Sequence, residues 1–349
     1  MSLAQFSGPP AEGERFVARR PGLPAPDTPP VHRRSRTGAE LDEFDVLEPF
    51  VSDAAVTDVF VNGGARVWVD RGAGPTPEEV SGLDEVRVRE LAVRLIALGG
   101  RHIDEATPCV DVRLHDGIRI HAVLPPISTD GALLSIRLPR VERLALSDLA
   151  AAGFFSIIDR DTVERLVARR ENLLITGAGG SGKTTLLAAL LSHAAPGDRI
   201  IAIEDVAELQ VDHPHFVSLE ARQANLEGAG QLGLERLVRE ALRMRPDRLV
   251  LGECRGAEVR ELLGALNTGH DGGAGTLHAN SLRDVPARIE ALGALAGMSP
   301  TAIARQTVSA IGTVLHLERD RGTRRLAQMG RFRLDRRDRL FMVDSDAAP

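Results

Sequence analysis

The sequence contains almost no lysine: of its 43 lysine and arginine residues, all but Lys183 are arginine. Such a bias indicates that arginine is used wherever either cation will serve. A lysine kept at one position therefore indicates a task that needs a compact ammonium group on a slim side chain, which the wide planar guanidinium group does not provide. We accordingly take Lys183 as the first candidate functional residue.

The sequence also has few cysteines, no positive net charge and no long apolar run. Cys109 and Cys254 lie far apart in no metal-binding spacing, and we expect a reducing cytoplasm. The net charge of -6 argues against a dedicated nucleic-acid binder without excluding one, because an acidic shell can enclose a basic channel. No run approaches the roughly 20 apolar residues that span a bilayer, and the first residues lack the apolar core of a signal peptide. Work at a membrane would therefore require docking onto a partner.

The chain divides into four predicted segments. Residues 1–40 hold seven of the 20 prolines and few apolar side chains, and we expect them to be disordered. Residues 41–140 combine helical periodicity with short alternating strands, which predicts a small α+β domain with an antiparallel sheet. Residues 141–160 are predicted to form a helical linker. Residues 161–349 alternate strands with helices, which predicts an α/β domain with a parallel central sheet and arginine-rich C-terminal strands.

One glycine-rich motif decides the class of the second domain. Residues 177–184, GAGGSGKT, fit G-x-x-x-x-G-K-[ST] between a buried strand and a helical pattern, which is the context that a phosphate-binding loop requires. Glycines let successive backbone N–H groups point at phosphate oxygens, and the helix N-terminus adds roughly half a positive charge. Lys183 is predicted to reach the β- and γ-phosphates of ATP, and the Thr184 hydroxyl to ligate Mg²⁺. The predicted nucleotide-binding residues are Gly177, Ala178, Gly179, Gly180, Ser181, Gly182, Lys183, Thr184 and Thr185.

Carboxylates follow two of the predicted parallel strands, whose carboxyl ends lie over the phosphate site. Glu204 and Asp205 point to opposite faces, so only one can face the metal, and we take Glu204 to help place Mg²⁺. Glu253 follows a glycine at the end of an apolar strand, where it is predicted to polarise the attacking water. The alternatives are an ordinary strand cap for Glu204, and for Glu253 a salt bridge to a nearby arginine: Arg245, Arg248 or Arg255.

Two histidines lie in a glycine-rich run, LNTGHDGGAGTLHAN, at residues 266–280. Glycine richness allows a tight loop near the nucleotide, and His278 is predicted to sense the γ-phosphate by hydrogen bonding. His270 is a candidate nucleotide contact. Structural histidines and a zinc site are the alternatives, although no matching cysteine or carboxylate pair accompanies them.

With these four motifs in this order, the sequence resembles the type II/type IV secretion ATPase superfamily, and within it the CpaF-like motors of tight-adherence (Flp-type) pili. The matching motifs, within residues 41–320, are GAGGSGKTT, IEDVAEL, ALRMRPDRLVLGECRG and NTGHDGGAGTLHAN. The resemblance implies a RecA-like ATPase domain and a homohexamer. It also implies a polytopic inner-membrane platform protein as partner, and a cytoplasmic location, peripheral on the inner face of the membrane.

The resemblance further implies that Arg119 and Arg137 reach the phosphates when the first domain closes, although their alternating pattern also fits a solvated face. Arg245 is a weaker candidate for a contact to a neighbouring subunit. The sequence departs from the family at His121, where asparagine is common, and at Val206, where threonine or proline is common. It also lacks the zinc-binding tetracysteine module of type II secretion ATPases, which favours the pilus or type IV branch.

These features together predict ATP hydrolysis that powers assembly of a pilus or secretion machine at the bacterial inner membrane. Two alternatives stay open: a conjugation-associated DNA-transfer motor, and a nucleotide-gated scaffold with negligible turnover. The segment 319–339, with nine arginines against three acids, is predicted to be a solvated strand edge or a docking surface for an acidic partner or anionic lipid.

Overall fold

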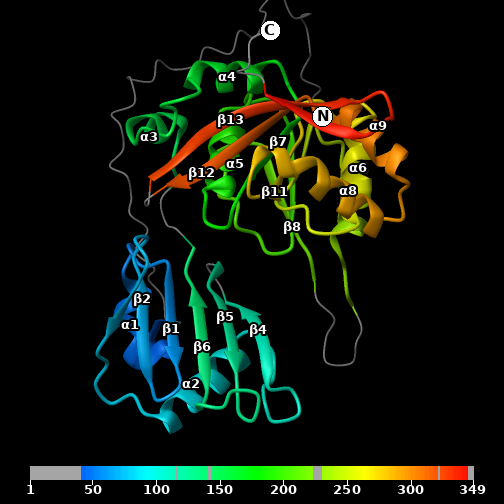
Figure 1. Cartoon of the computed structure of the whole chain (residues 1–349). Helices are drawn as coiled ribbons and strands as arrows, with labels where there is room; N and C mark the ends of the chain where they lie inside the picture. The colour runs from blue at the N-terminus through cyan, green and yellow to red at the C-terminus, as the bar shows by residue number, and fades with distance from the viewer. Residues whose placement is uncertain (1–40, 115–116, 140–142, 223–229, 321–322, 345–349) are drawn as a thin grey trace, which may run out of the picture. The chain divides into compact units, whose positions relative to one another are not determined.

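The fold contains two β-sheets, seen in a computed structural model that describes residues 41–114, 117–139, 143–222, 230–320 and 323–344 (Figure 1). The predicted disorder of residues 1–40 lies outside these ranges. Within them, no helix combines the length and apolar character needed to cross a lipid bilayer.

The first sheet has six antiparallel strands in the order β3-β2-β1-β6-β5-β4. Alternation places every second side chain in the core: Val59 and Val61 of β1 are buried while their neighbours are not. Strands β1 and β2 form a hairpin, with Asn62 paired to Arg66. The strands are β1 (Asp58–Asn62), β2 (Arg66–Asp70), β3 (Pro75–Glu78), β4 (Cys109–Arg113), β5 (Arg119–Val123) and β6 (Leu133–Arg137).

Helix α2 (Glu85–Leu98) supplies the largest helical face packed into the core of this sheet. Its apolar residues recur at helical spacing, and Val88, Leu91 and Leu95 are buried against the strands. Two short elements join the same core: the 3-10 helix η1 (Leu41–Leu47) and α1 (Glu48–Ser52).

The second sheet has eight strands in the order β14-β13-β12-β7-β11-β10-β8-β9. The six strands from β12 to β9 in this order run parallel; β13 pairs antiparallel with β12, and β14 pairs antiparallel with β13 at the edge of the sheet. The predicted fold class, an α/β domain with a parallel central sheet preceded by an antiparallel α+β unit, is therefore confirmed. The strands are β7 (Leu173–Gly177), β8 (Ile200–Glu204), β9 (Phe216–Glu220), β10 (Arg248–Leu251), β11 (Ala274–His278), β12 (Thr313–Asp320), β13 (Thr323–Leu334) and β14 (Leu340–Asp344).

Helices cover both faces of this sheet, which explains why its central strands are continuous apolar runs. In β7, Ile175 packs in a cluster with α3, α4 and α5, whereas its neighbour Leu174 packs in a second cluster with α6 to α9. The helices are α3 (Leu146–Ala151), α4 (Arg160–Ala168), α5 (Lys183–Ser192), α6 (Leu234–Leu242), α7 (Glu258–Leu266), the 3-10 helix η3 (Leu282–Asp284), α8 (Val285–Leu295) and α9 (Pro300–Ala310).

The parallel sheet brings residues from four separate segments of the chain to one edge. Strands β7, β8, β10 and β11 all end there, and their registers pair His278 with Gly177 and Leu251 with Ile203. Ligand sites of open α/β sheets lie outside the carboxyl ends of the strands. The candidate site is therefore at this edge.

Candidate nucleotide-binding site

The loop after β7 has the backbone geometry of a phosphate cradle. Gly177 has φ 151°, and a β-carbon added there would lie 2.6 Å from the carbonyl oxygen of Leu317, so only glycine fits. Gly180 and Gly182 have φ 68° and 99°, in the left-handed region that favours glycine. Helix α5 begins directly after Gly182, so its N-terminal N–H groups face the loop.

Lys183 already lies inside this loop. Its Nζ donates hydrogen bonds to the carbonyl oxygens of Gly177, at 3.0 Å, and Ala178, at 2.9 Å. The side chain is buried, and this burial lowers the pKa of Lys183, while the charge of Glu253 opposes the effect. Phosphate oxygens would accept the same N–H groups, so the ammonium is placed where its predicted role requires.

Glu253 sits between a histidine and an arginine. Its Oε1 lies 3.0 Å from His278 Nε2, and its Oε2 accepts a hydrogen bond of 2.7 Å from Arg255 Nη2. Burial raises the pKa of Glu253, but the hydrogen bond from Arg255 and the charges of Arg255 and Lys183 outweigh it and hold the pKa below its ordinary value. The salt bridge considered for Glu253 therefore exists, with Arg255, and it keeps the carboxylate ionised.

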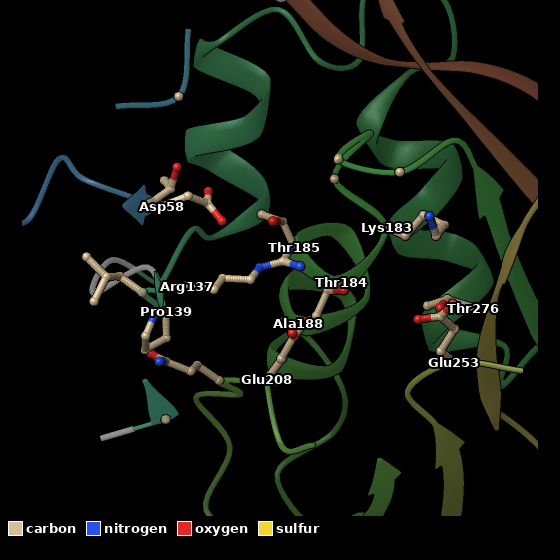
Figure 2. A pocket seen from close by; sticks show the side chains of 18 of the residues that line it. Asp58, Arg137, Pro139, Lys183, Thr184, Thr185, Ala188, Glu208, Glu253 and Thr276 are labelled. Atoms are coloured by element: carbon tan, nitrogen blue, oxygen red, sulfur yellow. The ribbon is translucent and has the colours of Figure 1, made fainter. Parts of the chain in front are cut away.

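Lys183, Glu253 and Arg255 line a cavity of about 420 Å³, a volume typical of small-molecule sites. Figure 2 shows Lys183, Thr184, Thr185, Glu253 and Thr276 around it. His278 and Gly179, Gly180 and Gly182 of the loop also line it. Sequence reasoning predicted most of these residues.

Outside the loop of residues 177–185, two predicted residues, Glu204 and His270, do not line the cavity. The Glu204 carboxylate is buried and accepts hydrogen bonds from the backbone N–H groups of Glu208, at 3.0 Å, and Leu209, at 3.1 Å. Burial raises the pKa of Glu204 to about 7, although these two hydrogen bonds oppose the rise. Glu204 thus anchors the loop after β8, as the strand-cap alternative proposed, and its role in placing Mg²⁺ stays a prediction.

His270 is the second of these residues. Its Nδ1 lies 3.1 Å from the carbonyl oxygen of Ala265 in α7. Because a carbonyl only accepts, Nδ1 carries the proton and donates it. This hydrogen bond stabilises the turn that follows α7. A nucleotide contact by His270 stays a prediction.

The two arginines of the first sheet both line the cavity and are paired across β5 and β6. Arg119 Nη2 lies 3.0 Å from Glu208 Oε1. Among the described residues, Arg137 has no ion-pair partner, and Figure 2 shows its side chain directed toward Thr184 and Thr185.

Besides Arg143, sequence reasoning missed two arginines of the cavity that lie in the C-terminal strands, Arg319 in β12 and Arg324 in β13. Their only signal was the arginine-rich composition of the segment 319–339, which we interpreted as an edge or a docking surface. The part of that segment at residues 321–322 lies outside the described ranges.

The cavity suits a magnesium nucleotide better than a protein-bound metal. In the described parts of the chain, no group of three or more histidine, cysteine, aspartate or glutamate side chains is arranged to hold a metal ion. Magnesium at nucleotide sites needs only one or two protein oxygens, because phosphates and water supply the rest. The Thr184 hydroxyl, which lines the cavity, could provide one.

Comparison with known proteins gives consistent results. Residues 40–327 match the family described as "Type II/IV secretion system protein". A Mycobacterium tuberculosis protein, whose name assigns it provisionally to conjugal transfer, is 48% identical over 301 residues, covering 84% of this chain and 86% of its own. A Sinorhizobium fredii protein, whose name likewise assigns it provisionally to conjugal transfer as TrbB, is 29% identical over 304 residues, covering 85% of this chain and 89% of its own.

Solved structures share the fold. The pilus retraction motor PilT with bound ADP gives a TM-score of 0.54 at 21% identity, covering 76% of this chain and 75% of its own. The ATPase DotB of Legionella pneumophila gives a TM-score of 0.53 at 18% identity, covering 86% and 78%. At these identities the likeness concerns the fold alone.

Proposed function

Because this chain belongs to the type II/IV secretion system family of ATPases, we propose that it binds ATP with Mg²⁺ in the cavity and hydrolyses it to drive a membrane-bound transport machine. The observation that carries this proposal is the position of Lys183. Its ammonium lies among the loop carbonyls and 3.3 Å from His278 Nδ1, and the other nitrogen of this ring lies 3.0 Å from Glu253 Oε1.

The loop of residues 177–185 binds the phosphates of the nucleotide. When bound, magnesium ATP supplies the γ-phosphoryl group and the positive charge of the metal. Lys183 exchanges its loop carbonyls for phosphate oxygens, and the N–H groups at the start of α5 hold the same oxygens. The Thr184 hydroxyl would ligate the metal, with Glu204 acting through water.

Glu253 orients the water that hydrolyses ATP. Its carboxylate is ionised at neutral pH, so it can accept a hydrogen bond from the attacking water and orient it. His278 Nε2 holds one oxygen of this carboxylate in place at 3.0 Å. Arg137 and Arg119 offset negative charge on the γ-phosphoryl group, a contribution worth about 10³–10⁵ in rate when a mobile element supplies it.

Coupling to movement rests on the first sheet. Arg119 is paired with Glu208, and a γ-phosphate would compete with this carboxylate for the guanidinium group. In a homohexamer, gain and loss of such contacts would move one unit of each subunit against the other. The protein would act in the cytoplasm on the inner face of the membrane, against a polytopic platform protein.

Two kinds of machine are candidates. The relatives named after conjugal transfer favour a conjugation-type apparatus. The motif resemblance favours assembly of a Flp-type pilus by a CpaF-like motor. Stimulation of ATP hydrolysis by DNA, with binding that weakens as salt rises, would favour the first, and its absence the second.

The central test compares two variants by calorimetry and by phosphate release. We expect Glu253→Gln to bind ATP with the affinity of the parent and to lose turnover by a factor of about 10² or more. Lys183→Ala should lose ATP binding itself. Parent-like turnover in Glu253→Gln would remove Glu253 from its role, and a parent protein without single-turnover hydrolysis would favour the scaffold alternative.

A further inference from the structure

Two arginines lie opposite each other on the antiparallel strands β12 and β13. Arg319 of β12 and Arg324 of β13 are direct cross-strand partners. Like charges placed opposite each other in a sheet destabilise it, whereas opposite charges stabilise it. The adjacent pair shows the usual solution: Glu318 lies opposite Arg325, and their side chains form an ion pair of 3.0 Å. Arg319 and Arg324 thus place two guanidinium groups next to each other, beside this ion pair.

Both arginines lie against the phosphate-binding loop. Arg324 Nε donates a hydrogen bond of 2.9 Å to the carbonyl oxygen of Gly180. A β-carbon added at Gly180 would lie 3.6 Å from Arg319 Nη1, and one added at Gly182 would lie 3.4 Å from Arg324 Cδ. The two side chains thus reach the loop over its glycines, and both line the cavity.

We propose that Arg319 and Arg324 complete the polyphosphate site: Arg319 binds the phosphate chain of the nucleotide, and Arg324 positions the loop by holding the Gly180 carbonyl. This inference rests on the proposed binding of ATP in the cavity. A polyphosphate beside Arg319 would offset the repulsion between the two guanidinium groups, and planar guanidinium groups match phosphate oxygens well.

The position of Arg324 has a separate consequence for the loop. A peptide unit is planar, so a contact that fixes the direction of its carbonyl oxygen also fixes the direction of the N–H group of the next residue. By holding the Gly180 carbonyl, Arg324 keeps the N–H of Ser181 in one orientation. Arg324 therefore acts through the loop backbone, while Arg319 acts on the ligand.

The test uses calorimetry with two probes, ATP and inorganic tripolyphosphate, on the full chain. We expect Arg319→Gln to weaken both by about tenfold, the loss of one charge-assisted hydrogen bond, and Arg319→Lys to keep most of the affinity. Arg333→Gln is the matched control, because Arg333 of the neighbouring strand β13 is exposed, as Arg319 is, but does not line the cavity.

Thermal unfolding separates a binding role from a structural one. Without ligand, Arg319→Gln should unfold at the same or a higher temperature than the parent, because it removes the like-charge pair. Its stabilisation by tripolyphosphate should be smaller than that of the parent. For Arg324→Gln we expect a higher KM for ATP than the parent, with partial rescue in Arg324→Lys, which retains an N–H donor.

Three outcomes decide the matter. Parent-like binding of both probes by Arg319→Gln, or a lower ligand-free unfolding temperature with unchanged affinity, would overturn the role of Arg319. A parent-like KM in Arg324→Gln would overturn the role of Arg324. Failure of the parent protein to bind ATP would instead overturn the proposed function on which both roles rest.

Discussion

Lys183 Nζ lies 3.3 Å from His278 Nδ1, and the other nitrogen of the same ring, Nε2, lies 3.0 Å from Glu253 Oε1. An ammonium group only donates, so Nδ1 must accept and Nε2 must carry the proton that it shares with Glu253. Burial lowers the pKa of His278, and the charge of Lys183 lowers it further, which favours this neutral form. One ring thus links the phosphate-binding lysine to the carboxylate proposed to hold water.

This linkage predicts that His278→Ala impairs hydrolysis more than binding. We expect kcat to fall roughly 10²-fold, because Glu253 loses the group that orients it. The affinity for ATP should change little, because Lys183 keeps its place in the loop. Steady-state kinetics together with calorimetry give the two quantities separately.

The matched control is His193→Ala, since His193 is an exposed histidine that does not line the cavity. It should resemble the parent in both measurements. An equal loss of kcat and of ATP affinity in His278→Ala would contradict an orienting role.

Glu204 predicts a dependence of stability on pH. Its pKa is raised from 4.5 to about 7, chiefly by burial, so the folded state binds its proton more tightly than the unfolded state. This contribution to stability is full below pH 4.5 and is lost as the pH rises through about 7. Glu204→Gln keeps an acceptor for the loop N–H groups and removes the titration, so it should flatten the loss.

Urea unfolding at about pH 5 and about pH 8 measures this difference, which should reach up to about 3 kcal/mol in favour of the variant at the higher pH. The N–H donors of Glu208 and Leu209 stay paired in the variant if the amide oxygen faces them. Parallel stability profiles of parent and variant would show that Glu204 does not titrate in this range.

The sequence was sufficient where chemistry depends on neighbours in the chain. The loop of residues 177–184 is contiguous, and its strand–loop–helix context and the positive φ of Gly177, Gly180 and Gly182 agree with what the motif predicts for the backbone. Glu253 and His278 could be predicted too, because Glu253 follows β10 and His278 ends β11 in one parallel sheet, so both lie at the same edge.

It was insufficient where position depends on distant partners. Arg319 reaches the loop only because β12 pairs with β7, and strand periodicity does not specify which strands pair. Glu204 is buried over Gly252, where an added β-carbon would lie 2.5 Å from Glu204 Cγ, so this close approach decides where its carboxylate points. His270 turns back to α7 by a hydrogen bond that the glycine-rich pattern did not indicate.

A last prediction concerns the ion pairs that anchor strand β10, which leads to Glu253. Asp198 Oδ2 accepts a hydrogen bond of 2.6 Å from Arg248 Nε, and Oδ1 lies 2.7 Å from Arg170 Nη1. Arg248 is 4% exposed, whereas the side chain of Arg170 is 37% exposed. Burial raises the pKa of Asp198, but Arg248 and Arg170 outweigh it and hold the pKa below 3.8, so the carboxylate is ionised.

We expect Asp198→Ala to lower the free energy of unfolding by about 3–5 kcal/mol, because it leaves the buried charge of Arg248 without an anion. Arg170→Ala removes the exposed partner of the same carboxylate and should cost about 1 kcal/mol or less. Urea unfolding at neutral pH compares the two. Similar losses in both variants would mean that solvent reaches Arg248 in the folded protein, and that burial does not set the strength of this anchor.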